Sequence, residues 1–429
     1  MRLQALDGWR GLACLLVAVH HLQVPHALYD QRWLQNAAPM LELFFIISGF
    51  VVSLVFAEMA RTPRGAAAFI LRMLGRIWPL HMVMLGSLVI LALLRSVFAE
   101  HGGFTDQMTI EALGAQVLLI QTWVGVGLSW NYPAWTLSTE LAAYLMFAGL
   151  MLVTRSRAAR IIGASALALL AATVFLNELG PREHYNIISL ARTLTGFFIG
   201  FLLREAWSGA RLHSAALATV LELAAVIGVI WTLNARLDGA AYFLNYAIFG
   251  FTVIVFASDR GLVSRALMWA PIQWLGKVSF SIYMVHGVIT LYLVQAFWAA
   301  ERFLGASFQV SRVNPWTWRN ELVFSFGSGL ADDAMLVFYF ILVLASATLV
   351  YRFIEAPTRA AASAFSEQIS QDIDKGRQAG RGRAAFRLAG LAAKRRETPP
   401  ETSRRRIDGW WGLPLYPRSP PGRASSGCD

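Results

Sequence analysis

Charge and cysteine are both scarce in this sequence. Charged residues make up 15% of the 429 residues, against about 25% in an average soluble domain, while 56% are hydrophobic and the mean hydropathy is +0.51. These proportions exclude an ordinary soluble protein. Only two cysteines occur, Cys14 in an apolar block and Cys428 near the C-terminus, so no disulfide framework is expected. No metal site is expected either.

The sequence contains long apolar blocks with few charged residues. A transmembrane helix needs about 20 mainly apolar residues, and about ten blocks approach or reach that length. The sequence therefore predicts an all-α fold, a polytopic bundle of about ten transmembrane helices. The expected spans are 11–23, 37–57, 77–99, 134–153, 161–176, 187–203, 215–233, 240–257, 278–298 and 334–350.

Positively charged loops orient these predicted helices. Arginines gather between Arg61 and Arg76, after the second span, and such loops face the cytoplasm. The later arginine-rich loops all fall on the same side only if the ambiguous apolar stretch 113–128 is interfacial or re-entrant. With that choice, both termini are cytoplasmic. The first apolar block is read as a retained span because no signal-peptide cleavage site follows it.

The formal charge of +11 lies mostly in the C-terminal part of the chain. Residues 359–429 contain 14 Lys and Arg against 7 Asp and Glu, a difference of +7. We expect residues 1–358 to form the membrane domain and residues 359–429 to form a basic, disordered cytoplasmic tail. A tail lying beside anionic membrane lipid explains this charge better than binding to nucleic acid does, so no nucleic-acid partner is expected.

Ionisable side chains inside the predicted spans are the candidate functional residues. A charge inside the bilayer is costly and usually belongs to a site or to a buried pair. Placing each residue at about 1.5 Å per helical position sorts the side chains into two sets. The set near the inner face is Arg10, Arg72 and Arg76. The set from the midplane outward is His20, His21, His286, Glu42 and Glu140.

The two sets suit different chemistry. Several guanidinium groups can bind phosphates, and histidine can transfer protons near neutral pH. Simpler explanations remain open for each. Arg72 and Arg76 can be positive-inside anchors, Glu42 and Glu140 can be buried partners that hold helices together, and the aromatic residues of 130–135 are typical of an interfacial belt.

Six ordered motifs connect these residues to a known family. They are Leu6-Asp7-Gly8-Trp9-Arg10-Gly11, Glu42-Leu43-Phe44-Phe45 with Ser48-Gly49-Phe50, Arg72 with Arg76, Trp135-Thr136-Leu137-Ser138-Thr139-Glu140, Gly276 with Tyr283 and His286, and residues 351–357. In this order the motifs resemble those of the acyltransferase-3 family of bacterial integral membrane acyltransferases, which includes sugar and polysaccharide O-acetyltransferases. The family's histidine follows its arginine by eleven positions, and that spacing identifies His21 rather than His20.

The resemblance implies an O-acyltransferase of the bacterial cytoplasmic (inner) membrane. Its co-substrate would be acetyl-CoA or another acyl-CoA, and its acceptor a carbohydrate or lipid-linked glycan. The phosphates of CoA would be held by Arg10, Arg72 and Arg76. His21 would act as general base or carry the acyl group transiently, and Glu140 or Glu42 would orient its ring.

A proton-coupled transporter is the alternative function, because transporters also place His, Glu and Arg within the membrane. The ordered motifs favour the acyltransferase. Loops such as 303–333 are expected to shape the acceptor site, but their residues identify neither the acceptor nor the length of the acyl chain.

Overall fold

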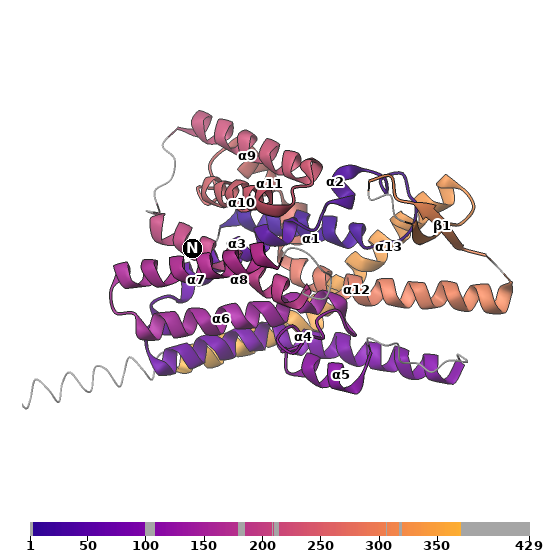
Figure 1. Ribbon diagram of the computed structural model, residues 1–429, viewed down its shortest axis with the longest axis horizontal. Helices are drawn as coiled ribbons and strands as arrows, with labels where there is room; N and C mark the ends of the chain where they lie inside the picture. The colour runs from indigo at the N-terminus through magenta and orange to yellow at the C-terminus, as the bar shows by residue number, and fades with distance from the viewer. Residues whose placement is uncertain are drawn as a thin grey trace, which may run out of the picture. The chain divides into compact units, whose positions relative to one another are not determined.

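The structure of the chain is a computed structural model that describes residues 3–98, 108–178, 185–207, 209, 214–305, 307–316 and 320–369. These residues are almost entirely helical (Figure 1). The α-helices are α1 (Gln4–His20), α2 (Arg32–Gln35), α3 (Met40–Phe56), α4 (Pro63–Phe98), α5 (Ile110–Val117), α6 (Trp135–Val153), α7 (Arg157–Asn177), α8 (Tyr185–Ala206), α9 (Ala215–Ala235), α10 (Phe243–Phe256), α11 (Leu262–Leu267), α12 (Ala270–Leu304) and α13 (Gly329–Val350). Short 3-10 helices are η1 (Met59–Arg61), η2 (Tyr132–Ala134) and η4 (Gly239–Tyr242).

The predicted class, a polytopic transmembrane helix bundle, is confirmed. Among the described residues, eight helices are long and apolar enough to cross a membrane, and they correspond to the third to tenth predicted spans. The first two predicted spans match α1 and α3, which have 17 residues each. Of these two, only α3 is counted among the shorter apolar helices of the described residues, so eight spans are shown and the total of about ten stays a prediction.

The first helix begins and ends earlier than the apolar block that predicted it. It starts at Gln4 rather than residue 11, because the Asp259 carboxylate accepts hydrogen bonds from the backbone N–H groups of Gln4 and Ala5 at 3.2 and 2.9 Å. These are N–H groups that the first turn of a helix leaves unpaired. Because this capping residue is some 250 positions away in sequence, the residues around Gln4 do not indicate that a helix begins there.

The stretch 113–128 does not form a spanning helix, in agreement with the expectation that it is interfacial or re-entrant. The eight-residue helix α5 ends at Val117, and an irregular segment leads from there to η2. Buried side chains satisfy its backbone: Gln121 Nε2 donates to the Ala134 carbonyl at 2.8 Å, and Gln116 Nε2 donates to the Ser129 carbonyl at 2.7 Å. Irregular backbone at membrane depth is stable only with such internal partners.

Helices α1 and α12 are in backbone contact. A Cβ atom at Gly11 would lie 2.5 Å from the Gly276 nitrogen, and one at Gly276 would lie 2.3 Å from the Asp7 carbonyl oxygen. Only glycine permits this approach, as at other close helix interfaces in membranes. The contact fixes the relative position of the two helices that carry Arg10, His21 and His286.

Two features of the C-terminal part were not predicted. The loop between α12 and α13 contains an antiparallel hairpin of β1 (Gln309–Val313) and β2 (Asn320–Phe324), with Gln309 opposite Phe324. After α13 the helix continues through a π-helical turn, η5 (Tyr351–Glu355), to residue 369. The expected domain boundary at residue 358 thus lies within a helix, and residues 370–429 lie outside the described part of the chain.

Candidate active site

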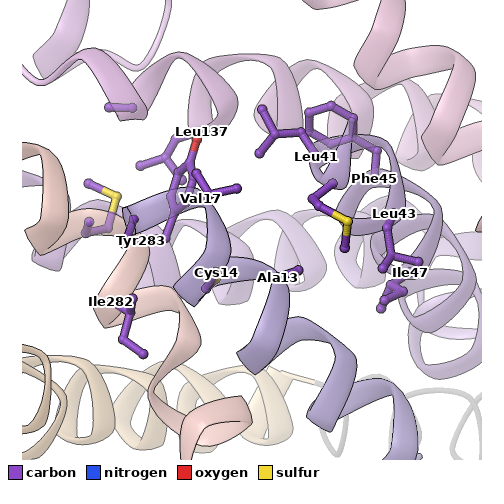
Figure 2. Packing of buried hydrophobic residues seen from close by; sticks show 14 of the residues in the cluster. Ala13, Cys14, Val17, Leu41, Leu43, Phe45, Ile47, Leu137, Ile282 and Tyr283 are labelled. Atoms are coloured by element: carbon purple, nitrogen blue, oxygen red, sulfur yellow. The ribbon is translucent and has the colours of Figure 1, made fainter. Parts of the chain in front are cut away.

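A cavity with about 470 Å³ of empty space lies between α1, α3, α4, α6 and α12. Figure 2 shows the packing of buried hydrophobic residues in this region, with Cys14 of α1 between Tyr283 on one side of the view and Leu41 and Phe45 of α3 on the other; all four residues line the cavity. The lining is apolar apart from a small group of charged and polar residues. The residues that line it are Arg10, Cys14, Leu41, Phe44, Phe45, Arg76, Thr136, Leu137, Glu140, Ser279, Phe280 and Tyr283.

Two arginines and one carboxylate form the charged end of this cavity. Glu140 lies near Arg10 and Arg76, and beside it the Ser48 and Tyr144 hydroxyl groups are 3.5 Å apart. Arg10 also pairs with Asp7, whose Oδ1 atom lies 3.8 Å from Arg10 Nη1, so Glu140 is the carboxylate nearest to Arg76 in this cavity. The Nε atom of Arg76 is buried and has no hydrogen-bond partner among the described residues. A buried donor without a partner requires an explanation, and an anionic ligand would supply one.

Arg72 does not line this cavity. It lies one turn before Arg76 on α4, and its guanidinium group stacks over the ring of Phe56 at 5.3 Å. Of the three arginines predicted to bind the donor, the structure therefore brings Arg10 and Arg76 together and leaves Arg72 closer to the N-terminal end of α4.

A second cluster surrounds His21, which follows the last residue of α1. The centroid of its ring lies 5.1 Å from that of His20, 5.1 Å from that of His286 and 5.2 Å from that of Tyr132. His286 is fully buried, and neither of its ring nitrogens makes a hydrogen bond of normal geometry with a described residue. Three imidazoles and a phenol thus meet where α1, α12 and the start of α6 converge.

The hydrogen bonds of the two neighbouring histidines distinguish their roles. Nδ1 of His21 lies 2.8 Å from the Val17 carbonyl oxygen, and Nδ1 of His20 lies 2.9 Å from the Leu34 carbonyl oxygen. A carbonyl oxygen can only accept, so each Nδ1 is the protonated nitrogen and each Nε2 carries the lone pair. His21 is therefore in the tautomer that a general base needs, and the partner that orients it is a backbone carbonyl rather than Glu140 or Glu42.

Glu140 lies with the arginines and not with the histidines, contrary to the depth predicted from sequence. The prediction assumed that α6 starts at the outer membrane face. Instead the re-entrant segment delivers η2 into the bundle, where the ring of Tyr132 reaches His21 and Pro133 packs against Gly287 of α12. Glu140 lies eight residues further on, about 12 Å along the helix, at the level of the arginines.

Glu42 belongs to neither cluster. Its Oε1 atom accepts a hydrogen bond from Arg192 Nε at 2.6 Å, and the two side chains are 0% and 13% exposed. The Arg192 guanidinium also lies 6.0 Å from the ring centroid of Trp135 and 5.7 Å from that of Tyr242. This geometry is that of a buried ion pair joining α3 to α8, the alternative that the sequence left open.

The aromatic segment 130–135 is not an interfacial belt. Trp130 and Trp135 are 2% and 5% exposed, and Trp130 Nε1 donates to the Thr109 carbonyl at 2.9 Å. A belt requires rings at the membrane surface, whereas these rings pack inside the bundle and support Tyr132. The sequence signal that could have revealed this is the density of polar residues in the preceding segment, which has no place in a lipid-facing stretch.

Tyr283 connects the two clusters. It lines the cavity, its hydroxyl donates to the Pro133 carbonyl at 3.0 Å, and the centroid of its ring lies 5.5 Å from that of His286. Arg10 and His21 stand eleven residues apart on α1, a rise of about 16 Å. The site therefore has an arginine end and a histidine end at different heights along α1, with one phenol ring between them.

Comparison with known proteins identifies the family of the chain. The sequence profile of a family described as an acyltransferase domain matches residues 3–352. The acyltransferase MdmB of Streptomyces mycarofaciens is 27% identical over 326 residues, which cover 68% of this chain and 80% of the relative. The O-acetyltransferase OatA of Staphylococcus aureus is 22% identical over 324 residues, which cover 68% of this chain and 51% of the relative, so the chain spans about half of that protein. No solved structure matches the chain. Because the profile extends over most of the sequence, the chain belongs to this acyltransferase family and is a membrane-bound acyltransferase.

Proposed function

We propose that this acyltransferase moves an acetyl or other acyl group from acyl-CoA on the cytoplasmic side to a hydroxyl group of a cell-surface or exported glycan. The observation that carries the proposal is the separation of two clusters along the same helices, Arg10 and Arg76 at one level and His21 with His286 at the other. Such an arrangement suits a donor that enters from one side and an acceptor that enters from the opposite side.

The donor end of the site suits the phosphates of CoA. Arginine binds phosphate through two parallel hydrogen bonds and stays charged at any physiological pH. Arg10 and Arg76 would hold these groups, and Arg72, one turn away, would meet them nearer the N-terminal end of α4. The rise of about 16 Å from Arg10 to His21 is of the order of an extended phosphopantetheine arm, so the thioester would reach the histidines.

The histidine end suits proton transfer. As the acceptor oxygen attacks the thioester carbonyl, its proton passes to Nε2 of His21, and the bond between carbonyl carbon and sulfur breaks. The proton on Nε2 then passes to the departing thiolate, which leaves as neutral CoA thiol. The alternative is that Nε2 itself attacks the thioester and carries the acyl group to the acceptor. In either route the Nδ1 hydrogen bond to Val17 keeps Nε2 available.

The name of one relative, an O-acetyltransferase, supports a hydroxyl as the acceptor atom. The glycan acceptor, cytoplasmic termini and residence in a bacterial inner membrane form part of the proposal and rest on the resemblance of the motifs and on the loop charges. The transporter alternative receives no support from the family to which the chain belongs.

Substitution of Arg76 tests the donor site. Purified Arg76→Ala should bind acetyl-CoA at least about ten-fold more weakly than the wild type, because a charged hydrogen bond to phosphate is removed. Binding is measured by isothermal titration or by retention of labelled acetyl-CoA in detergent. Arg72→Ala should weaken binding less, because Arg72 lies outside the cavity.

Arg64→Ala is the matched control. Arg64 is exposed at the start of the same helix, so its removal changes the charge of the chain equally and should leave binding unchanged. Equal binding by Arg76→Ala and the wild type would remove Arg76 from the donor site and leave it as a topology anchor. A wild-type protein that neither binds acetyl-CoA nor releases CoA from it would contradict the proposed donor altogether.

A further inference from the structure

A second and larger hollow, with about 1300 Å³ of empty space, lies between the C-terminal ends of α4 and α12 and the strand β1. None of its residues belongs to the candidate active site. Just below it, the Tyr292 hydroxyl of α12 donates to the Ser87 carbonyl of α4 at 2.7 Å and holds the two helices together. The residues that line the hollow are Leu91, Leu94, Arg95, Gln295, Trp298, Ala299, Glu301, Arg302, Phe303 and Gln309; we call it the α4–α12 groove.

The helix lengths place this groove at the surface of the membrane. Between Arg76 and Arg95, α4 has 18 residues without Asp, Glu, Lys or Arg, about 27 Å of helix, and the corresponding stretch of α12 from Lys277 to Glu301 has 23 residues, about 34 Å. The hydrocarbon layer is about 30 Å thick. Arg95 and Trp298 therefore stand where hydrocarbon gives way to headgroups. Figure 1 shows these ends of α4 and α12 on the side of the bundle where the hairpin lies.

The polar wall of the groove suits an anion. The guanidinium group of Arg95 lies over the ring of Trp298, 5.4 Å from its centroid, and makes no ion pair with a described acidic residue. Glu301 also lines the groove, but its Oε1 atom accepts from the backbone N–H groups of Phe308 and Gln309 at 2.7 Å each, so the loop holds this carboxylate and it forms no ion pair with Arg95. An arginine held flat against an aromatic ring keeps its edge free for bidentate contact with phosphate oxygens.

The opposite wall suits hydrocarbon. Leu91 and Leu94 form the lower edge of the groove, and the neighbouring side chains Ile90, Leu93 and Leu94 are 58%, 53% and 49% exposed. In a membrane these side chains face lipid tails. A phosphate site above an apolar strip matches a phospholipid. In a membrane its headgroup lies at the surface and its acyl chains extend into the hydrocarbon layer, in the same order as the arginine and the leucines of the groove.

The groove does not present a ligand to the histidines. Gln295 follows His286 by nine residues, about two and a half helical turns, so the groove lies on the side of α12 opposite to His286. A glycan acceptor bound there would be separated from His21 by the helix itself. We propose that the α4–α12 groove binds the phosphate of an anionic membrane phospholipid, with its acyl chains along the exposed apolar side chains of α4.

The test uses the full chain reconstituted in nanodiscs of phosphatidylcholine with or without phosphatidylglycerol. Native mass spectrometry counts retained phosphatidylglycerol, and thermal unfolding reports the stabilisation it gives. Phosphatidylglycerol should raise the unfolding temperature of the wild type. Arg95→Gln should retain the lipid about ten-fold more weakly and lose most of this stabilisation, because the charged contact to phosphate is gone. Arg64→Gln, the same loss of charge at the other end of α4, should behave as the wild type.

A second substitution keeps the test informative if Arg95→Gln fails to fold. Arg95→Lys preserves the charge but not the two-pronged geometry, and it should retain the lipid with intermediate strength. Wild-type retention of phosphatidylglycerol in whichever Arg95 variant folds would overturn the proposal. So would equal stabilisation by free glycerol phosphate in phosphatidylcholine discs, which would show a site for a soluble anion instead of a lipid.

Discussion

Replacement of His21 by alanine should lower acyl transfer by about 10²- to 10⁴-fold, the usual contribution of a positioned general base. The expected loss follows from the Nδ1 hydrogen bond to Val17, which leaves Nε2 unprotonated, and from the position of the ring against His286 and Tyr132. Transfer is measured in reconstituted membranes as release of CoA together with acylation of surface glycans. Binding of acetyl-CoA should persist, because Arg10 lies about 16 Å away along α1 and Arg76 of α4 lines the same cavity as Arg10.

His20→Ala is the matched control for this prediction. His20 is adjacent in sequence, but its Nδ1 atom bonds the Leu34 carbonyl of α2 and so ties that short helix to the end of α1. Its loss should lower stability and leave most of the transfer rate per folded molecule. The opposite result, with His20→Ala inactive and His21→Ala active, would show that the eleven-residue spacing identified the wrong histidine. Full activity in both variants would remove the histidine mechanism.

The relative positions of site residues on one helix could be predicted from sequence. The positions of residues on a helix whose starting depth in the bundle is unknown could not. Arg10 and His21 keep their relation because a helix fixes the rise between them. Glu140 could not be placed, because its depth depends on how far the re-entrant segment carries the start of α6 into the bundle. Hydropathy marks where an apolar helix lies, but it does not report that a helix begins beside His286 instead of at the membrane surface.

Partners distant in sequence were also beyond prediction. Glu42 was recognised as a carboxylate of the right type near the start of a span, but its partner Arg192 is 150 residues away and carries no motif of its own. Tyr283 and His286 lie in a recognised motif, yet only the contact between α1 and α12 shows that His286 meets His21, with Tyr283 beside His286. A pattern of residue types predicts which chemistry is available, and packing decides which groups share it.

Replacement of Glu42 by alanine should destabilise the protein by about 3–5 kcal/mol, because it leaves the Arg192 guanidinium buried without its carboxylate. The free energy of unfolding, or the unfolding temperature in detergent, measures this effect. Glu58→Ala is the control, because the exposed pair of Glu58 with Arg61 should contribute less than about 1 kcal/mol. If Glu42→Ala is as stable as the wild type, Glu42 does not act as a buried partner of Arg192.

A double substitution separates this structural role from a catalytic one. Replacing both partners, as Glu42→Met with Arg192→Met, removes both buried charges and fills the space with apolar side chains. Such replacements of buried ion pairs are often neutral or stabilising, so the double variant should recover most of the stability that Glu42→Ala loses. If Glu42 has only a structural role, the double variant should recover acyl-transfer activity together with stability. A double variant that is stable and binds acetyl-CoA but transfers no acyl group would instead place Glu42 in the chemistry, despite its distance in the fold from the histidine cluster.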